Sequence, residues 1–375
     1  MLTRKFFERL SKPQLTQERF TVMREREKQA YTDFIKSPPY IQASILTSDL
    51  IEMKRWQNHD VLEYVVSDLL TWSALRDFVE NSLFSRCKVQ ALAHGNIDAT
   101  EACALVEEVS NILRPPPLCT SEFPADLRIL ELPPGRPVVI RRHPQKSSRL
   151  LERFANAHET NSAVEVYLQV GLQSRPLTGI LQLAAQIIDT HALQQLRTVE
   201  QLGYIVETSC RLDRAVMGLS LIVQSSTHNA AALDERVEAF LETVPSLLAN
   251  TSSKDFAKYR RASIDVALKK DQGMREESSQ HWRKIVPLGS YEFDHLKRNA
   301  QAMASVTQRD LCEFWERYMA VESPRRRRLS SQVFAPRFEL PAKPSRGNAV
   351  YLDSLEEILE FRASLPVFPM KRRCG

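Results

Sequence analysis

The chain has 375 residues, with 51 Lys and Arg against 46 Asp and Glu, which gives a formal net charge of +5. A hydrophobic content of 43% and a charged content of 26% are ordinary for a globular protein and argue against global disorder, and the length suggests two domains or one large one. The ten glycines are too scattered for a GxGxxG turn, a P-loop or a GxSxG elbow. Nucleotide cradles and the usual serine-hydrolase turn are therefore disfavoured.

The six cysteines are never closer than 16 residues, so no CxxC pair starts a zinc finger. They are also too sparse for a disulfide scaffold, and no secretory signal peptide is recognisable. We therefore expect a reducing compartment and a cytoplasmic protein. A mitochondrial location is the alternative, because the opening segment is basic and aromatic. The longest uncharged run contains too many polar residues to span a bilayer.

The first 115 residues are predicted to be mostly helical. Apolar spacing and charge patterning predict helices over residues 1–12, 20–34, 40–53 and 62–84. A short strand is predicted at Cys87–Ala93, followed by a turn at His94-Gly95-Asn96 and a helix capped by Asp98 or Thr100. Pro115-Pro116-Pro117 ends this helix and marks the predicted domain boundary.

After the boundary, strands alternate with helices. Strands are predicted at 127–132, 138–142, 163–170, 217–223 and 329–334, and a further strand follows Tyr204. Helices are predicted at 180–188, 237–248, 256–268, 274–285, 307–319 and 355–361. In the strand 163–170 the apolar and polar side chains alternate, which places them on opposite faces. This mixture predicts an α+β fold with two domains, residues 1–115 and 116–375.

The eight histidines do not form a recognisable metal-binding motif. They are never closer than 14 residues to one another, so neither HExxH nor HxxEH occurs. His158-Glu159 begins such a motif, but Ser162 stands where the second histidine is needed. We predict no metal ligand from the sequence, and a zinc site assembled from remote residues is a minor alternative.

The segment LRTVEQLGY, Leu196 to Tyr204, carries two side chains suited to binding a peptide carbonyl or an oxyanion. The Arg197 guanidinium offers a planar fork of donors, and the neutral Tyr204 phenol can donate to a developing negative charge. The structural alternative is an ion pair between Arg197 and Glu200, three residues apart, with Tyr204 packed at a strand start.

Several segments resemble the C-terminal half of the insulysin-type zinc metalloendopeptidases, which include insulin-degrading enzyme, nardilysin and pitrilysin. The most specific is LRTVEQLGYIV, because it contains an RTxEQLGY core. The others, in collinear order around it, are ALAHGNID (91–98), NSAVEVYLQVGLQS (161–174), GLSLIVQSS (218–226), ERVEAFLET (235–243), VESPRRRR (321–328) and EFRASLPVFP (360–369).

The resemblance implies a clamshell peptidase of four domains in two halves. The N-terminal half would carry HxxEH, a zinc ion and a general-base Glu, and the C-terminal half would close the chamber and contact the peptide through residues that correspond to Arg197 and Tyr204. It implies that residues 1–115 are the remainder of the third domain and 116–375 the fourth, each an antiparallel sheet packed with helices, with the first one truncated.

The implied partners are a peptide substrate and the N-terminal catalytic half, in cis or as a separate subunit. Because the zinc motif is absent, we expect no cofactor in this chain and no activity from it alone, with zinc in the missing half. The alternative is that the chain is a non-catalytic peptide-binding or regulatory homologue of the same fold, so it stays open whether the chain is part of an enzyme. Nucleic-acid binding through Arg325–Arg328 and the tail at 371–373 is a third hypothesis, but a solvated strand start is favoured and no nucleic-acid partner is expected.

Overall fold

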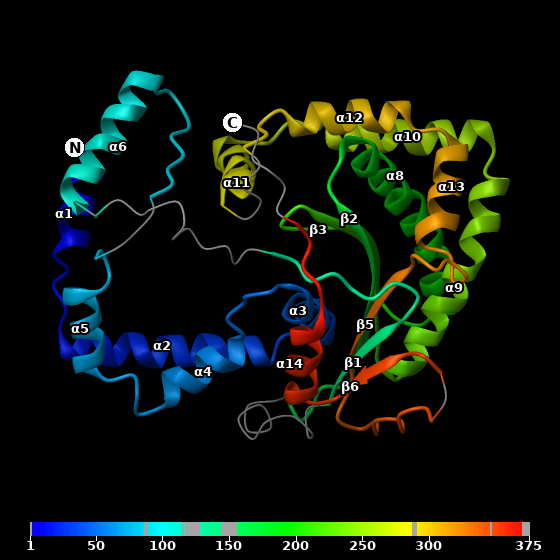
Figure 1. Cartoon of the computed structure of the whole chain (residues 1–375), viewed down its shortest axis with the longest axis horizontal. Coiled ribbons are helices and arrows are strands. Elements are labelled where there is room, and N and C mark those ends of the chain that lie inside the picture. Colours follow the sequence, from blue (N-terminus) through cyan, green and yellow to red (C-terminus); the bar gives the residue numbers. More distant parts are fainter. Residues whose placement is uncertain are drawn as a thin grey trace. The chain divides into compact units, whose positions relative to one another are not determined.

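The computed structural model divides into two compact units (Figure 1). It describes residues 2–85, 89–114, 116, 128–143, 156–286, 291–345 and 347–369. The first unit comprises Met1–Phe34, Trp56–Ala125 and Asp271–Tyr291, and the second comprises Ile35–Arg55, Asp126–Lys270 and Glu292–Gly375. Most of the predicted proline linker and the basic tail at 371–373 lie outside the described residues.

The first unit is helical in its described part, as predicted. Its helices are α1 (Leu2–Ser11), α2 (Gln17–Ile35), α4 (Asn58–Val66), α5 (Trp72–Asn81), α6 (Ala99–Leu113) and α11 (Met274–Ile285). The predicted Asp98 cap is confirmed, because Asp98 and Glu101 form a reciprocal capping box at the start of α6. The predicted helix 62–84 is two helices, since the chain turns after α4 and Thr71 caps α5.

The hydrophobic core of the first unit is thin. Among its described residues, the buried apolar side chains are Leu62, Val65, Val109 and Ile285. The strand predicted at Cys87–Ala93 is wrong for residues 89–93, which form irregular backbone, and residues 86–88 lie outside the described chain. A strand needs a neighbour for its backbone hydrogen bonds, and no described strand pairs with this segment.

The second unit contains a six-stranded sheet in the order β3-β4-β2-β5-β1-β6. The strands are β1 (Val138–Arg142), β2 (Ser162–Leu172), β3 (Ile205–Asp213), β4 (Val216–Ser225), β5 (Arg327–Val333) and β6 (Val350–Leu352). The prediction of an antiparallel sheet is wrong for one edge, since β1 pairs in parallel with both β5 and β6. The long connections on either side of β5 return the chain to the same end of the sheet, so these strands share one direction.

Helices cover both faces of this sheet (Figure 1). On one face lie α8 (Arg175–Ala192), α9 (Ala230–Asn250) and α13 (Gln308–Tyr318), and α10 (Ser253–Ala267) and α12 (His295–Ser305) pack outside α8. On the other face lie α3 (Pro39–Ile51) and α14 (Leu355–Ser364). The α+β class predicted from the sequence is confirmed.

The two faces of β2 are both buried, although its side chains alternate as predicted. The apolar face, which includes Val164 and Val166, packs into the helical core. The polar face lies beneath α3, where Glu165 is 1% exposed and accepts a hydrogen bond of 3.0 Å from Nη1 of Arg211. Arg211 Nη2 also donates to the Ser48 hydroxyl of α3 at 2.6 Å. This network satisfies a charge that burial would otherwise make costly.

The compact units do not follow one continuous division near residue 115. Residues 35–55 lie in the second unit because α3 places Ala43, Leu46 and Leu50 in a core cluster with β2 and β5 residues. Residues 271–291 lie in the first unit although they follow most of the sheet in sequence. The assignment of 1–115 and 116–375 to two insulinase-type domains stays a prediction.

Candidate functional site

The segment that carries Arg197 leaves α8 through a wider helical turn. Residues Leu193–Val199 form a π-helix, η3, whose buried residue Leu196 anchors it in the helical core. Such π-helical turns occur often at functional sites, because the extra residue re-aims the side chains around it. Here the turn leaves Arg197 exposed on the surface beside a fully buried neighbour.

The backbone after η3 is fixed by two close contacts. Gln201 has a φ of 53°, and the next amide, Leu202 N, donates to Leu196 O at 3.0 Å, which folds the chain back against η3. Gly203 then passes so close to β4 that a Cβ at this position would lie 1.9 Å from the Gln224 carbonyl oxygen. Only glycine permits this approach, and it delivers Tyr204 immediately before β3 begins.

Arg197 and Tyr204 are brought together. The Arg197 Cζ lies 4.4 Å from the centroid of the Tyr204 ring, a cation–π arrangement. The Tyr204 side chain is 78% exposed, so neither group is sealed in the interior. The pair offers guanidinium and phenol donors to a group arriving from solvent, which is the chemistry that a peptide carbonyl or oxyanion requires.

The alternative interpretation, an Arg197–Glu200 ion pair, is not the arrangement observed. Glu200 Oε2 pairs instead with Nε of Arg236 at 2.7 Å, and its other oxygen accepts from Gln195 at 2.9 Å. The hydrogen bond from Arg236 is the main cause that lowers the pKa of the Glu200 carboxyl. Glu200 is therefore engaged by Arg236 and Gln195, while Arg197 stacks on the Tyr204 ring.

The arginine run Arg325–Arg328 is largely engaged inside the second unit. Arg326 and Arg328 are each 6% exposed, so the predicted solvated strand start is wrong for these two residues. Arg328 pairs with Asp234 at 2.6 Å and with Glu238 at 2.9 Å, and Arg326 pairs with Glu238. Asp234 and Glu238 are one helical turn apart on α9, which brings both carboxylates to the same guanidinium. Guanidinium groups held this way are not available to phosphates.

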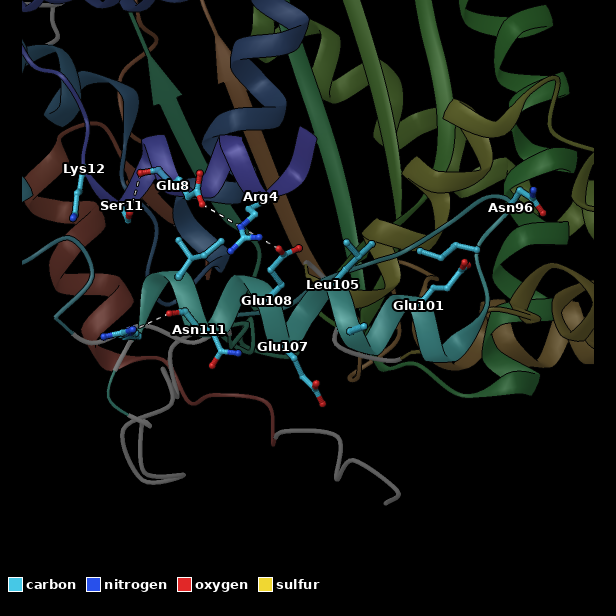
Figure 2. A pocket seen from close by; sticks show the side chains of 14 residues that line it. Arg4, Glu8, Ser11, Lys12, Asn96, Glu101, Leu105, Glu107, Glu108 and Asn111 are labelled. Carbon is cyan, nitrogen blue, oxygen red and sulfur yellow. Dashed lines mark hydrogen bonds and ion pairs between the residues drawn. The ribbon is translucent and has the colours of Figure 1, made fainter. Parts of the chain in front are cut away.

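An open hollow of about 1390 Å³ lies in the first unit between α1 and α6 (Figure 2). Arg4 spans it, with Nε 3.1 Å from Glu8 on its own helix and 3.4 Å from Glu108 on α6. The side chains around it carry charges of both signs, so the hollow has no strong preference for an anion or a cation. Arg197 and Tyr204 are not among its lining residues.

Three potential metal ligands meet elsewhere in the first unit, although the sequence predicted none. One ligand atom from each of His94, Glu277 and His281 lies within 4.8 Å of the other two. The spacing of Glu277 and His281 on one helix face is the clue that the sequence contained, but His94 comes from a loop far away in the chain. The set does not fit the HxxEH site implied by the resemblance, which needs both histidines on one helix.

No helix among the described residues combines the length and the apolar character needed to cross a bilayer. This agrees with the expectation from the sequence.

Known proteins similar to this chain include insulin-degrading enzymes and a nardilysin-like protein. A family model described as the C-terminal lobe domain 4 of PQQ synthase PqqF-like proteins matches residues 183–282. Insulin-degrading enzyme-like 1, peroxisomal, of Arabidopsis thaliana is 29% identical over 96% of this chain, and the Homo sapiens insulin-degrading enzyme is 27% identical over 99%. A nardilysin-like protein of Arabidopsis thaliana is 30% identical over 84% of the chain.

The solved structures agree in fold. The crystal structure of pitrilysin superposes with a TM-score of 0.78 and 18% identity, covering 96% of this chain and 36% of that one. A peptidase M16 inactive domain from Pseudomonas fluorescens gives a TM-score of 0.57 and 12% identity, with coverage of 92% and 76%. The chain spans 36% of the length of the two insulin-degrading enzyme relatives and 30% of the nardilysin-like protein.

Proposed function

We propose that this chain closes the chamber of an insulysin-like zinc metalloendopeptidase and contacts the peptide substrate. The proposal starts from its membership of the insulinase family, in which it corresponds to the C-terminal half of the enzyme. The observation that carries the proposal is the exposed stack of Arg197 on Tyr204, 4.4 Å from guanidinium carbon to ring centroid, in the RTxEQLGY segment. The zinc ion and the general base would come from an N-terminal half, in cis or as a separate subunit.

Arg197 and Tyr204 would act on the substrate as donors. The guanidinium edge would bind a backbone carbonyl of the peptide, and the phenol would donate to the oxygen that becomes negative as the peptide bond is attacked. The cation–π stack would hold both groups in one orientation before the peptide arrives, which reduces the ordering cost on binding. One such donor typically contributes about 3 kcal/mol to transition-state stabilisation, or roughly 100-fold in turnover.

The surface of the first unit supports a covering partner. Large apolar side chains stand open to solvent there, including Trp56 at 85%, Leu69 at 71% and Phe78 at 51% exposure. Apolar groups exposed at this level around a thin core are typical of a surface that another polypeptide covers. An N-terminal catalytic half is the partner we propose for it. We also propose a reducing compartment such as the cytoplasm, as expected from the sparse cysteines.

The test is mutagenesis in the assembled enzyme, with this chain joined to or co-purified with its HxxEH-bearing half. Arg197→Ala and Tyr204→Phe should each lower kcat for a fluorogenic peptide by roughly 100-fold, with unchanged zinc content and unfolding midpoint. The matched controls are Arg317→Ala and Tyr318→Phe, because these residues form another arginine–tyrosine stack, at 5.3 Å, in the same unit. Unchanged turnover in both site variants would show that the pair is scaffold.

The isolated chain separates the main proposal from the alternative. We expect it to cleave no peptide, since the HxxEH motif is absent from its sequence. A non-catalytic peptide-binding homologue would instead retain peptides without any partner and after treatment with a chelator. Peptide cleavage by the isolated chain that a chelator abolishes would overturn both.

A further inference from the structure

We propose that His94, Glu277 and His281 form a zinc-binding site in the first unit. Two imidazole nitrogens and a carboxylate oxygen are a ligand set that suits Zn²⁺, with a fourth position left for water. The site joins a loop to a helix that are 183 residues apart in the chain. A metal ion bound there would therefore link the His94 loop to helix α11.

The distances from the Glu277 carboxylate to the two imidazoles suit one shared ion. His94 Nε2 lies 3.5 Å from Glu277 Oε2, and His281 Nε2 lies 3.8 Å from Glu277 Oε1. Two ligands bound to one tetrahedral zinc at its usual bond lengths are about 3.3 Å apart. The two distances to the carboxylate are within about half an ångström of this value, and the three ligand atoms lie within 4.8 Å of one another. Each oxygen of the Glu277 carboxylate faces one histidine, Oε2 toward His94 and Oε1 toward His281, so either oxygen can serve as the ligand.

The His94 ring is oriented by a second contact. Its Nδ1 lies 2.6 Å from the Ser278 hydroxyl on α11, a hydrogen bond that occupies the nitrogen facing away from the cluster. When Nδ1 carries the proton and donates it to Ser278, Nε2 keeps its lone pair for the metal. Metal-bound histidines usually have such a partner on the other nitrogen, which fixes the tautomer and the ring plane.

The backbone on each side is built to bring these groups together. Glu277 and His281 are four residues apart on α11, so they lie on one face of the helix. The loop approaches that face at Gly95, whose φ of 132° is left-handed and where a Cβ would lie 3.2 Å from the Met274 sulfur. A side chain at this position would strain the backbone of the His94 loop and crowd the Met274 sulfur.

Packing alone holds this region weakly. Ile285 is the only described residue of α11 that is buried, and Trp282 on the same helix is 40% exposed. The ligand side chains are between 22% and 49% exposed, which leaves a route for the ion and room for a water ligand. Where few apolar contacts join two segments, metal ligation contributes directly to folding stability.

The charge of the adjacent surface affects which ligand would occupy the fourth position on the metal ion. An open hollow of about 830 Å³ beside the cluster is lined by His94, Arg275 and Arg283 among others. The two guanidinium groups repel a bare cation, so they weaken zinc affinity to some degree. They also favour an anion, such as hydroxide or a carboxylate, in the fourth position. We therefore expect affinity in the micromolar range or tighter, and an increase when a carboxylate such as acetate is present.

The test is metal titration of the full-length chain after removal of metals with a chelator. Calorimetry with Zn²⁺ should give one site per chain, and Co²⁺ should give the absorption bands of a four-coordinate complex with nitrogen and oxygen ligands. His94→Ala and His281→Ala should weaken Zn²⁺ binding at least 100-fold, and Ser278→Ala should weaken it about 10-fold. Zn²⁺ should raise the thermal midpoint of the parent chain but not that of the histidine variants.

Matched controls keep the test decisive. His158→Ala removes an exposed histidine of the second unit and should leave zinc affinity unchanged. Glu277→Gln keeps the shape of the side chain, so its loss of affinity would not reflect misfolding, and circular dichroism checks every variant. Absence of Zn²⁺ binding below 100 µM (about −5.5 kcal/mol), or equal binding by the parent chain and His94→Ala, would overturn the proposal. Zinc binding by the isolated chain without peptide cleavage would support this site and leave the peptidase proposal intact.

Discussion

Replacing Gly203 with alanine should disrupt the strand start that positions Tyr204. A Cβ at Gly203 would lie 1.9 Å from the Gln224 carbonyl oxygen and 2.9 Å from its carbon, and real Cβ contacts are essentially never below 3.0 Å. Both obstacles are backbone atoms of β4, so no side chain can rotate away. The start of β3 must therefore move from β4 by about 1 Å, which breaks the first pair of the ladder, Ile205 with Gln224.

The magnitude follows from two opposing effects. Forcing extra volume into a packed site costs typically 1–3 kcal/mol, and sometimes more. Alanine also restricts the unfolded chain, which returns about 0.4–1 kcal/mol where the backbone angles suit it. Since Gly203 has no left-handed φ, this second effect applies in part, and we expect a net loss of about 2 kcal/mol.

The assay is urea unfolding together with hydrogen exchange of the peptides that span β3 and β4. Gly203→Ala should unfold at lower urea and exchange faster in these strands. Gly273→Ala is the matched control, because its Cβ would have nothing within 4 Å and its φ of −174° is ordinary extended backbone. We expect the control to stay within about 0.5 kcal/mol of the parent chain. Equal unfolding midpoints and equal exchange in the two variants would refute the steric argument.

Three further predictions concern buried charges and thiols. Burial raises the pKa of Glu238, but hydrogen bonds and charges from Arg326 and Arg328 outweigh it and leave the pKa below its ordinary value. Its stabilising contribution is therefore present above about pH 4.5 and lost as pH falls through the lowered pKa, so urea midpoints of Glu238→Gln should depend less on pH in the acid range. Arg328→Met should cost about 3 kcal/mol in urea unfolding at pH 7, because it removes the buried guanidinium that pairs with the half-buried Asp234 and Glu238, and a smaller loss than for the exposed Arg261→Ala would contradict this. Burial raises the pKa of the Cys210 thiol to about 12, so iodoacetamide at pH 8 should label the exposed Cys103 and spare Cys210 until the chain is unfolded, as peptide mass spectrometry would record.

Local patterns in the sequence predicted most helices and strands of the second unit. The alternation over 163–170 and the stripe at Met217, Leu219 and Leu221 correspond to β2 and β4, which lie side by side in the sheet. The helix predicted at 256–268 corresponds to α10, which begins where the Ser252 hydroxyl accepts a hydrogen bond from the Asp255 amide. These features depend on residues within a few positions of one another, so the chain's own periodicity suffices.

Long-range pairing could not be predicted in the same way. Nothing local to β1 indicates that β5 and β6 run parallel to it, since their direction depends on how long connections return. The alternation along β2 separated its two faces but did not show that α3 covers the polar one, where Arg211 pairs with Glu165. The arginines at the start of β5 were predicted to be solvated because their carboxylate partners on α9 are about 90 residues away in the chain.

The same difference between local and long-range information applies to the candidate site. By itself the sequence identified Arg197, Gly203 and Tyr204 as one short motif, since all of its members lie within eight consecutive positions. Tertiary structure decided what surrounds them. The Gln224 backbone lies close against Gly203, and Glu200 pairs with Arg236 instead of Arg197. Tertiary structure alone also brought His94 close to Glu277 and His281, because only folding can bring side chains 183 positions apart within 4.8 Å of one another.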